Sequence, residues 1–217
     1  MKAARLDDDR SGGDADRSVA LTTKVFLVRH GAHAELGRVL TGRRDGIPLT
    51  PEGRAQAEAV AGRLAGEQIR AVHASPRERA VETASIIAGR LGAEVQIVPE
   101  LDEIDFGDWS GRSFDALAGE AGWDAWNSHR GSASTPGGET MAAAVARAAA
   151  HVAGLVTGGG GVVCVSHCDI IRGLIADTLG LPLDNLLRFD IDTASLSTLV
   201  VGDWGSRVIS LNERMPA

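Results

Sequence analysis

Short apolar runs alternate with longer segments of helical period along most of the chain. Residues 25–28 and 162–165 are unbroken apolar runs, a pattern typical of strands that are buried on both faces. All the segments predicted as strands are short and rich in aliphatic or β-branched side chains: residues 25–28, 69–74, 95–98, 162–165, 196–201 and 208–211. The pattern therefore predicts a sheet assembled from strands that are far apart in the sequence.

Capping residues predict where the first two helices begin and end. Thr50 is expected to cap a helix that has Pro51 at its first position, where a missing N–H costs nothing. Ser75 and Glu78 form a capping-box pair, which predicts the start of a second helix at this point. Gly92 is expected to end that second helix.

The remaining segments complete an alternation of strands and helices. Residues 141–156 and 170–179 predict two more helices, whereas residues 99–140 predict loops and a short helix over one end of the sheet. This order predicts an α/β fold, a three-layer sandwich with a mostly parallel central sheet and helices on both faces. Residues 1–20 are predicted to be a disordered tail, and residues 21–217 a single domain.

Composition limits the kinds of partner that the protein is expected to bind. The 217 residues include 22 Lys and Arg against 29 Asp and Glu, a formal net charge of −7, which argues against nucleic acid or an anionic membrane surface. An anionic ligand would therefore need a local cluster of Arg and His. Only two cysteines, Cys164 and Cys168, and no apolar run of about 20 residues indicate a cytoplasmic protein.

Two of the buried strands are followed by histidine. The first strand runs into Arg29, His30 and Gly31, and the strand at 162–165 is followed by His167. Ligands of parallel sheets bind beyond the carboxyl ends of the strands, so both histidines can converge on one pocket. A single histidine in such a place can instead be a hydrogen-bonded residue at a strand end, but the paired context favours a site.

Arginines in the second predicted helix offer positive charge near the same edge of the sheet. Helix N-termini attract anions, and a guanidinium group matches the oxygens of a phosphate group. Arg79 is a candidate for that role. Arg77 is expected to lie on the surface and to pair with Glu78 or Glu82.

These residues belong to blocks that resemble the histidine phosphatase superfamily, which has the phosphoglycerate-mutase-like fold. Each block resembles a family motif, and the blocks occur in the family's order: residues 26–31 (FLVRHG), 45–57, 75–84, 101–111 and 165–172. One such motif alone would be weak evidence, but the resemblance covers residues 23–211. It implies the fold predicted above.

The resemblance also implies a role for five residues. His30 is the nucleophile that attacks phosphorus and forms a phosphohistidine, while Arg29, Arg79 and His167 hold the phosphoryl oxygens. Glu103 donates a proton to the leaving oxygen. Because a neutral imidazole is nucleophilic near pH 7, no metal or other cofactor is expected.

Other assignments from the resemblance concern the acid and the substrate contacts. Asp105 is the alternative acid if Glu103 is not. Trp109 is expected to pack beneath its loop rather than touch substrate. Substrate contacts are expected from Gly31, Arg38, Thr41, Gly42 and Cys168.

Departures from the family pattern follow the first motif and the second histidine. Residues 32–35 lack the family's hydroxyl and amide donors, and Arg38 or backbone N–H groups are expected to replace them. His33 is expected to face solvent, and its use as a replacement ligand is the alternative. Cys168 stands where the family usually has glycine. Cys164 and Cys168 could form one pair of metal ligands, but no second pair accompanies them in the sequence, which argues against a structural zinc ion.

The function expected from the sequence is hydrolysis of a small phosphorylated metabolite, with no nucleic acid or membrane partner. A cofactor-dependent phosphoglycerate mutase-type isomerase is the alternative, although residues 111–136 offer only Arg112, His129 and Arg130 to grip a substrate carboxylate. A non-catalytic protein that binds a phosphorylated ligand is a further alternative. The sequence predicts neither the substrate nor the oligomeric state.

Overall fold

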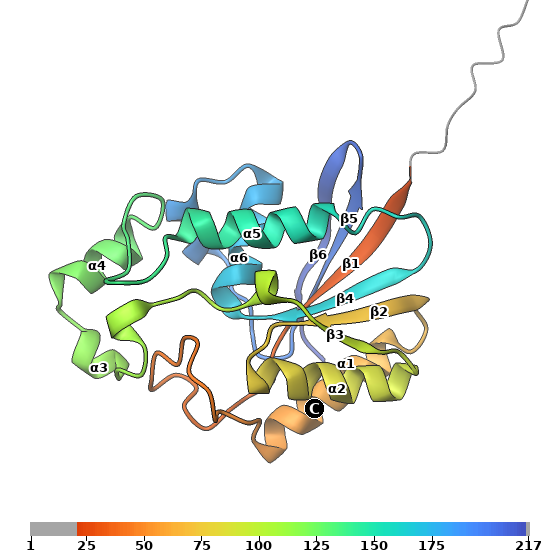
Figure 1. Ribbon diagram of the computed structural model, residues 1–217, viewed down its shortest axis with the longest axis horizontal. Coiled ribbons are helices and arrows are strands. Elements are labelled where there is room, and N and C mark those ends of the chain that lie inside the picture. Colours follow the sequence, from red (N-terminus) through yellow and green to blue (C-terminus); the bar gives the residue numbers. More distant parts are fainter. Residues whose placement is uncertain (1–20, 216–217) are drawn as a thin grey trace, which may run out of the picture.

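Six strands form one sheet in the order β3-β2-β4-β1-β5-β6 (Figure 1). The computed structural model describes residues 21–215. The strands are β1 (Thr22–Arg29), β2 (Ile69–Ala74), β3 (Val95–Ile97), β4 (Gly161–Ser166), β5 (Leu196–Gly202) and β6 (Gly205–Glu213). β1 to β4 are parallel to one another, β5 is antiparallel to β1, and β6 is antiparallel to β5. All six predicted strands are present, and the sheet is mostly parallel as expected.

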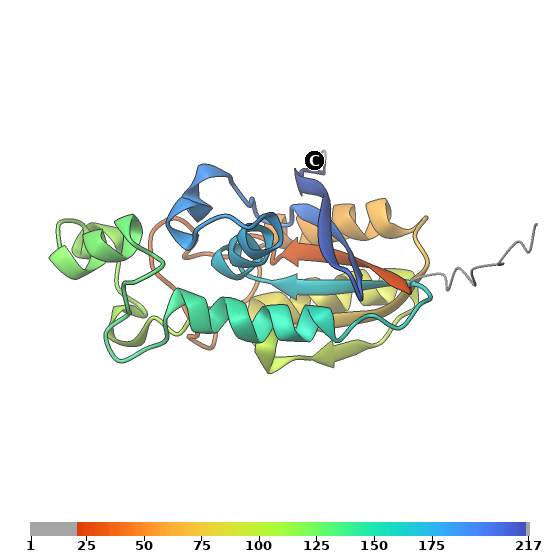
Figure 2. The ribbon, with the colours of Figure 1, turned by 90° about the horizontal axis from the view of Figure 1, so that it is seen from above.

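Helices cover both faces of the sheet. They are α1 (Pro51–Leu64), α2 (Glu78–Leu91), α3 (Phe114–Leu117), α4 (Ala121–Ser128), α5 (Met141–Ala153) and α6 (Cys168–Leu179). Side chains alternate along β1, so Val25 and Leu27 pack with α5 and α6, whereas Phe26 and Val28 pack with α1 and α2. The predicted α/β fold with three layers is therefore confirmed, and Figure 2 shows the layers from above.

The first two helices begin differently. The Thr50 side chain accepts a hydrogen bond from the N–H of Gly53, which confirms the predicted cap of α1. The capping box predicted for α2 is wrong. The helix begins at Glu78, and its N-cap residue is Arg77, whose side chain makes no capping hydrogen bond. Ser75 lies two residues before this cap position, and its hydroxyl accepts from the N–H of Arg77 at 3.3 Å as well as bonding to groups at the edge of the sheet. Gly92 ends α2 in the left-handed conformation, as predicted.

Residues 99–140 gather beyond the carboxyl ends of the parallel strands. They contain two 3₁₀ turns, η1 (Pro99–Leu101) and η2 (Gly107–Trp109), and the short helices α3 and α4. Together with the loop after β1 they project past the end of the sheet, on the left of Figure 2. A third 3₁₀ segment, η3 (Leu183–Arg188), follows α6. The loops thus surround the strand ends where ligands of parallel sheets bind.

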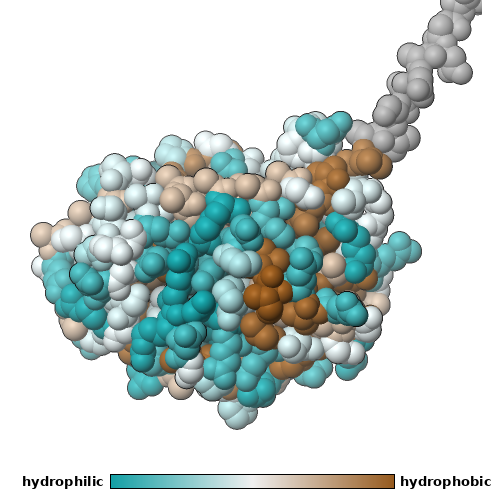
Figure 3. Space-filling view, in the orientation of Figure 1, coloured by the Kyte–Doolittle hydropathy of each residue, from teal (hydrophilic) through white to brown (hydrophobic). Residues whose placement is uncertain are grey.

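The face seen in Figure 3 is mostly hydrophilic, with a hydrophobic band right of centre near β3, whose Ile97 is 46% exposed. Within residues 21–215, no helix combines the length and the apolar character needed to cross a bilayer. The tail predicted at residues 1–20 lies outside the described residues.

Candidate active site

The carboxyl ends of β1 and β4 lie side by side in the sheet. Arg29 of β1 is the register partner of Ser166 of β4, and the N–H of His30 donates to the Ser166 carbonyl at 3.0 Å. The side chains that follow these ends meet, since the ring centroids of His30 and His167 are 5.2 Å apart. The structure therefore brings together the two histidines that were predicted to converge.

His30 presents a neutral imidazole to a cavity of about 550 Å³. Its Nδ1 lies 2.9 Å from the Gly31 carbonyl oxygen, and because a carbonyl only accepts, Nδ1 carries the proton. Burial, together with the charges of Arg79 and Arg29, holds the pKa of His30 well below its usual 6.5. The lone pair at neutral pH is therefore on Nε2, a nitrogen that can attack an electrophile in the cavity.

The backbone after His30 is held by close packing against α1 and α2. A Cβ added to Gly31 would lie 2.4 Å from the Gly53 carbonyl oxygen, so only glycine allows this approach. The N–H of Gly31 donates to the Thr83 hydroxyl at 3.0 Å. Gly31 was expected to contact substrate, but its N–H is engaged with Thr83 and its carbonyl with His30. It holds His30 in place instead.

Arg29, which is half-buried, and Arg79, which is buried, direct their guanidinium groups toward the same cavity. Nη1 of Arg29 donates to the Ile191 carbonyl at 2.7 Å, and Nη2 of Arg79 donates to the Gly42 carbonyl at 2.8 Å. Within the part of the chain that is described, Nε of Arg29 and both Nε and Nη1 of Arg79 are buried without a partner. Buried donors without partners are costly, so these nitrogens indicate a ligand with several acceptor oxygens.

His167 is fully buried and is connected to Asp102 through Ser75. Its Nε2 lies 2.7 Å from Ser75 Oγ, and Ser75 Oγ lies 3.2 Å from Asp102 Oδ1. Because the Asp102 carboxylate accepts, the Ser75 hydroxyl donates to it and accepts from Nε2–H of His167. Nδ1 of His167 then accepts from Arg79 Nη2 at 3.2 Å. Burial, with Arg79 nearby, lowers the pKa of His167 well below 6.5, so this ring is also neutral.

Arg77 is part of this network and does not lie free on the surface. The expected pairing with Glu78 or Glu82 is wrong, because Arg77 precedes the helix and turns toward the edge of the sheet. Its Nε lies 3.0 Å from Asp102 Oδ1 and its Nη1 lies 2.9 Å from Asp45 Oδ1. Arg77 therefore keeps charge next to the carboxylate that supports the second histidine.

Glu103 places a carboxyl group at the wall of the cavity. Its Oε2 lies 3.8 Å from Nδ1 of His167, and its Oε1 accepts from the N–H of Ile104 at 2.9 Å. Burial and the charge of Asp169 raise the pKa of Glu103 to about 7, although Arg79 opposes this shift. The side chain of Asp105 is 44% exposed and is not part of the cavity lining. The position of Glu103, rather than that of Asp105, suits an acid with a proton to donate at neutral pH.

The loop after β1 differs in part from expectation. Thr41, Gly42 and Cys168 line the cavity, and their contact with substrate stays a prediction. Arg38 does not line it, because its exposed guanidinium turns back to the Ala34 carbonyl at 2.6 Å.

His33 also departs from expectation, because it does not face solvent. It is buried at the cavity wall, with its ring centroid 5.3 Å from that of His30. Burial lowers the pKa of His33 to about 4, and its Nδ1 has no partner among the described residues. A buried neutral imidazole therefore lies in the segment where this chain lacks the hydroxyl and amide donors of the family pattern.

Several contributors to the site were missed from the sequence. Ser75, Asp102 and Thr83 position the two histidines, and Asp169 lines the cavity with Arg130 at 2.6 Å. Ser75 could have been found, because it follows β2 at the same edge of the sheet as the two histidines. Asp102 and Thr83 carry no comparable signal, since only the packing of loops and helices brings them to that edge.

The tryptophan of the acid loop behaves as expected. Trp109 is buried and contacts the edges of Trp123 and Trp126, with ring centroids 5.4 Å and 6.3 Å away. It is absent from the cavity lining within the described residues. Trp109 therefore anchors the loop that carries Glu103.

Comparisons with known proteins agree with this geometry. Residues 25–214 match the family model of the histidine phosphatase superfamily (branch 1). The adenosylcobalamin/alpha-ribazole phosphatase of Escherichia coli K12 is 30% identical over 196 residues, covering 88% of this chain and 96% of that protein. A probable phosphoglycerate mutase of Photorhabdus laumondii is 34% identical, covering 80% and 83%. The solved structure of YhfR from Bacillus stearothermophilus has a TM-score of 0.83 at 27% identity, covering 88% and 97%.

Proposed function

The chain belongs to the histidine phosphatase superfamily (branch 1), and from this we propose that it is a phosphatase that hydrolyses a small phosphomonoester through a phosphohistidine on His30. The observation that carries the proposal is the meeting of a neutral His30 with unpartnered arginine donors and a carboxyl group of raised pKa. These are the nucleophile, the oxyanion donors and the acid that phosphoryl transfer to an imidazole requires.

In the first step, Nε2 of His30 attacks phosphorus while the bond between phosphorus and the ester oxygen breaks. The free Nε of Arg29 and the free nitrogens of Arg79 take the phosphoryl oxygens, whose charge builds in the transition state. Glu103 gives its proton to the leaving oxygen, so that an alcohol rather than an alkoxide departs. His30 then carries the phosphoryl group, and Glu103 is ionised.

In the second step, water attacks phosphorus and the bond to His30 breaks. The Glu103 carboxylate takes one proton from that water, which restores the acid and releases orthophosphate. His30 returns to its neutral form with the proton still on Nδ1.

His167 changes its hydrogen bonding when an anion binds. With Nε2 donating to Ser75, its Nδ1 can donate to a phosphoryl oxygen only after it takes up a proton from solvent as the anion binds. A phosphoryl dianion beside the ring favours that proton, and the link through Ser75 to Asp102 stabilises the resulting charge. His167 thus becomes a cationic donor in the complex.

The charges in and around the cavity favour hydrolysis over isomerisation. A mutase has to grip a substrate carboxylate, and the arginines here are already matched: Arg130 pairs with Asp169, and Arg172 lies near Asp169 and Asp190. Arg112 pairs with Glu120 and is outside the cavity lining. Of the relatives above, the Escherichia coli protein is named a phosphatase and the Photorhabdus protein a mutase, so an assay has to separate the two activities.

Acid-quench trapping tests the proposal. The protein is mixed with a ³²P-labelled phosphomonoester, quenched, and assayed for acid-labile label on the chain, in parallel with orthophosphate release across a panel of esters and isomerisation of 3-phosphoglycerate. We expect label and orthophosphate from wild type, neither from His30→Ala, and little isomerisation. Label on His30→Ala, or isomerisation that far exceeds orthophosphate release, would contradict the proposal. Binding without label would indicate a non-catalytic protein.

We also propose a cytoplasmic location and a small phosphorylated metabolite as substrate. The cavity volume of about 550 Å³ suits a metabolite of modest size. Both cysteines are free thiols, which is typical of a reducing compartment.

A further inference from the structure

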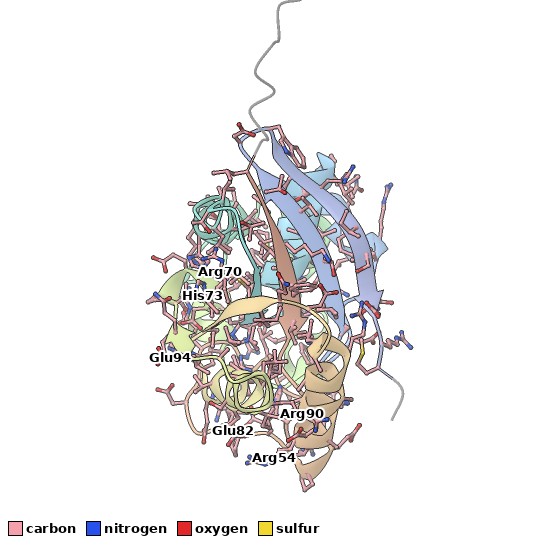
Figure 4. The ribbon with its side chains drawn as sticks, turned by 90° about the vertical axis from the view of Figure 1, so that its right-hand side faces the viewer. Arg54, Arg70, His73, Glu82, Arg90 and Glu94 are labelled. Atoms are coloured by element: carbon pink, nitrogen blue, oxygen red, sulfur yellow. The ribbon has the colours of Figure 1, made fainter. Side chains whose placement is uncertain are left out.

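A second group of reactive side chains lies between β2, β4 and α5. His73 of β2 is the register partner of Cys164 of β4, and His151 of α5 packs over this pair. None of the three lines the catalytic cavity. Figure 4 shows His73 and Arg70 on the side of β2 that faces α5, whereas Arg54 and Glu82 lie on the side of α1 and α2.

The donor atoms of this cluster are close together. Nδ1 of His73 lies 3.0 Å from Nε2 of His151, and the two rings are tilted by 53° with centroids 5.1 Å apart. Ligand atoms of all three side chains lie within 4.8 Å of one another. Bonds of about 2.0–2.3 Å around a tetrahedral Zn²⁺ place donors roughly 3.3–3.7 Å apart. The two nitrogens are already within this range, and the Cys164 sulfur has to move closer to them by up to about 1 Å.

The cluster consists of two imidazoles and one thiol, which are side chains that bind zinc in proteins. A neutral imidazole has one ring nitrogen with a free lone pair, so each of the two rings can supply one bond to a metal ion. The nearby charges are Arg70, which opposes a cation, and Glu100 beside His151, which favours one.

We propose that His73, His151 and Cys164 bind a zinc ion, with solvent in the fourth position on the half-buried side of His151. Binding releases the thiol proton of Cys164 to solvent and replaces the hydrogen bond between the imidazoles with two bonds to the metal. The imidazole that donated this hydrogen bond moves its proton to its other ring nitrogen.

The sequence argued against zinc because the pair Cys164 and Cys168 lacks a second ligand pair. The fold supplies that pair from β2 and α5, whereas Cys168 points elsewhere, with its Sγ 3.5 Å from the Ile191 carbonyl oxygen. The ion would join two strands and a helix across a separation of 78 residues between His73 and His151. Since the ligands come together only in the folded chain, the ion would stabilise that state.

Cobalt substitution and zinc titration of the full chain test the site. Metal-free protein is titrated with Zn²⁺ against a chromogenic chelator, and separately with Co²⁺ while the near-ultraviolet thiolate-to-cobalt absorption is recorded. We expect about one tightly bound equivalent, a thiolate band and a higher melting temperature with zinc. In Cys164→Ala the band should disappear, and in His151→Gln zinc affinity should fall at least about tenfold.

Matched controls separate this cluster from the catalytic cavity, which also holds imidazoles. Cys168→Ala, which removes the other thiol, and His30→Ala, which alters the catalytic ligands, should both keep the band and the affinity. Circular dichroism checks that Cys164→Ala and His151→Gln are folded. The proposal is overturned if wild type shows no thiolate band, or if the band survives in Cys164→Ala and is lost in Cys168→Ala.

Discussion

Glu103 owes its proposed role to the surroundings of one carboxyl group. Its pKa of about 7 comes from burial and from Asp169, against the opposing charge of Arg79. Because the protonated form donates to the leaving oxygen, kcat/KM for an alkyl phosphate should fall about tenfold per pH unit above about 7. Steady-state kinetics between pH 5 and 9 measure this fall.

Substitution of the acid tests the same assignment. Glu103→Gln should lower kcat/KM for an alkyl phosphate by about 10²–10⁴-fold and remove the decline at high pH. The loss should be smaller with p-nitrophenyl phosphate, whose leaving group needs no proton. Asp105→Asn is the matched control and should resemble wild type, since that carboxyl lies outside the cavity lining. A larger loss in Asp105→Asn would transfer the role to that residue.

Ser75 is predicted to position His167 rather than to touch substrate. In Ser75→Ala the buried Nε2–H of His167 loses its acceptor and its link to Asp102. We expect about 1–3 kcal/mol of lost interaction, seen as a ten- to hundredfold lower kcat/KM and weaker inhibition by orthophosphate. Ser85→Ala removes an exposed hydroxyl from α2 and should change neither. Equal kinetics in both variants would show that Ser75 has no such role.

At the scale of elements, α1 acts as the support of the loop that carries His30. A Cβ on Gly53 would lie 2.1 Å from the Ala32 carbonyl oxygen, whereas Gly62 in the same helix has no atom within 4 Å. Glycine within a helix costs about 0.5–1 kcal/mol relative to alanine. Gly62→Ala should therefore stabilise the protein by about that amount, because nothing opposes the gain.

Gly53→Ala should have the opposite effect, because its Cβ has to displace backbone next to His30. Both stability and kcat should fall, by more than the gain that Gly62→Ala provides. Urea unfolding and steady-state kinetics of the two variants measure the contrast. Stabilisation by both substitutions would mean that the backbone of α1 and of the loop can move apart at this contact without a cost in stability.

The elements could be predicted from local pattern wherever packing agreed with it. All six strands, the Thr50 cap and the stop at Gly92 were recognisable, because burial and capping impose regular signatures. The capping box predicted at Ser75 was wrong because the same hydroxyl can either cap a helix or bond to His167. Capping is visible in the local sequence, but the bond to His167 forms only when β2 and β4 lie side by side.

For the whole molecule, histidine protonation should control stability in acid. Burial lowers the pKa values of five histidines below the usual 6.5: His30, His33, His73, His151 and His167. Below pH 6.5 these histidines bind protons in the unfolded chain but stay neutral in the folded chain. The free energy of unfolding should therefore decrease as pH falls toward 4. The raised pKa of Glu103 opposes this effect between its usual 4.5 and about 7, but it is one group against five.

Urea unfolding at pH 7.5 and pH 5.5 measures this linkage. The midpoint should be lower at pH 5.5, and the difference should shrink in His33→Gln, which removes one group with a pKa of about 4. A midpoint that rises at pH 5.5 would show that the histidines are protonated in the folded state.

The acidic character of the chain does not prevent it from holding an anionic ligand. The net charge of −7 belongs to the chain as a whole, whereas Arg29 and Arg79 place buried donor nitrogens at one edge of the sheet. Local donors at short range outweigh a distant and screened surface charge.

The sequence by itself determined the layered α/β fold, the convergence of His30 and His167, and the family to which the chain belongs. These follow from local patterns and from motifs that stand in one order along the chain. Only the tertiary structure decided the burial of His33, the link from His167 through Ser75 to Asp102, and the meeting of His73, His151 and Cys164. Hydrogen bonds and burial between residues far apart in sequence depend on which elements pack together, and no local pattern records that.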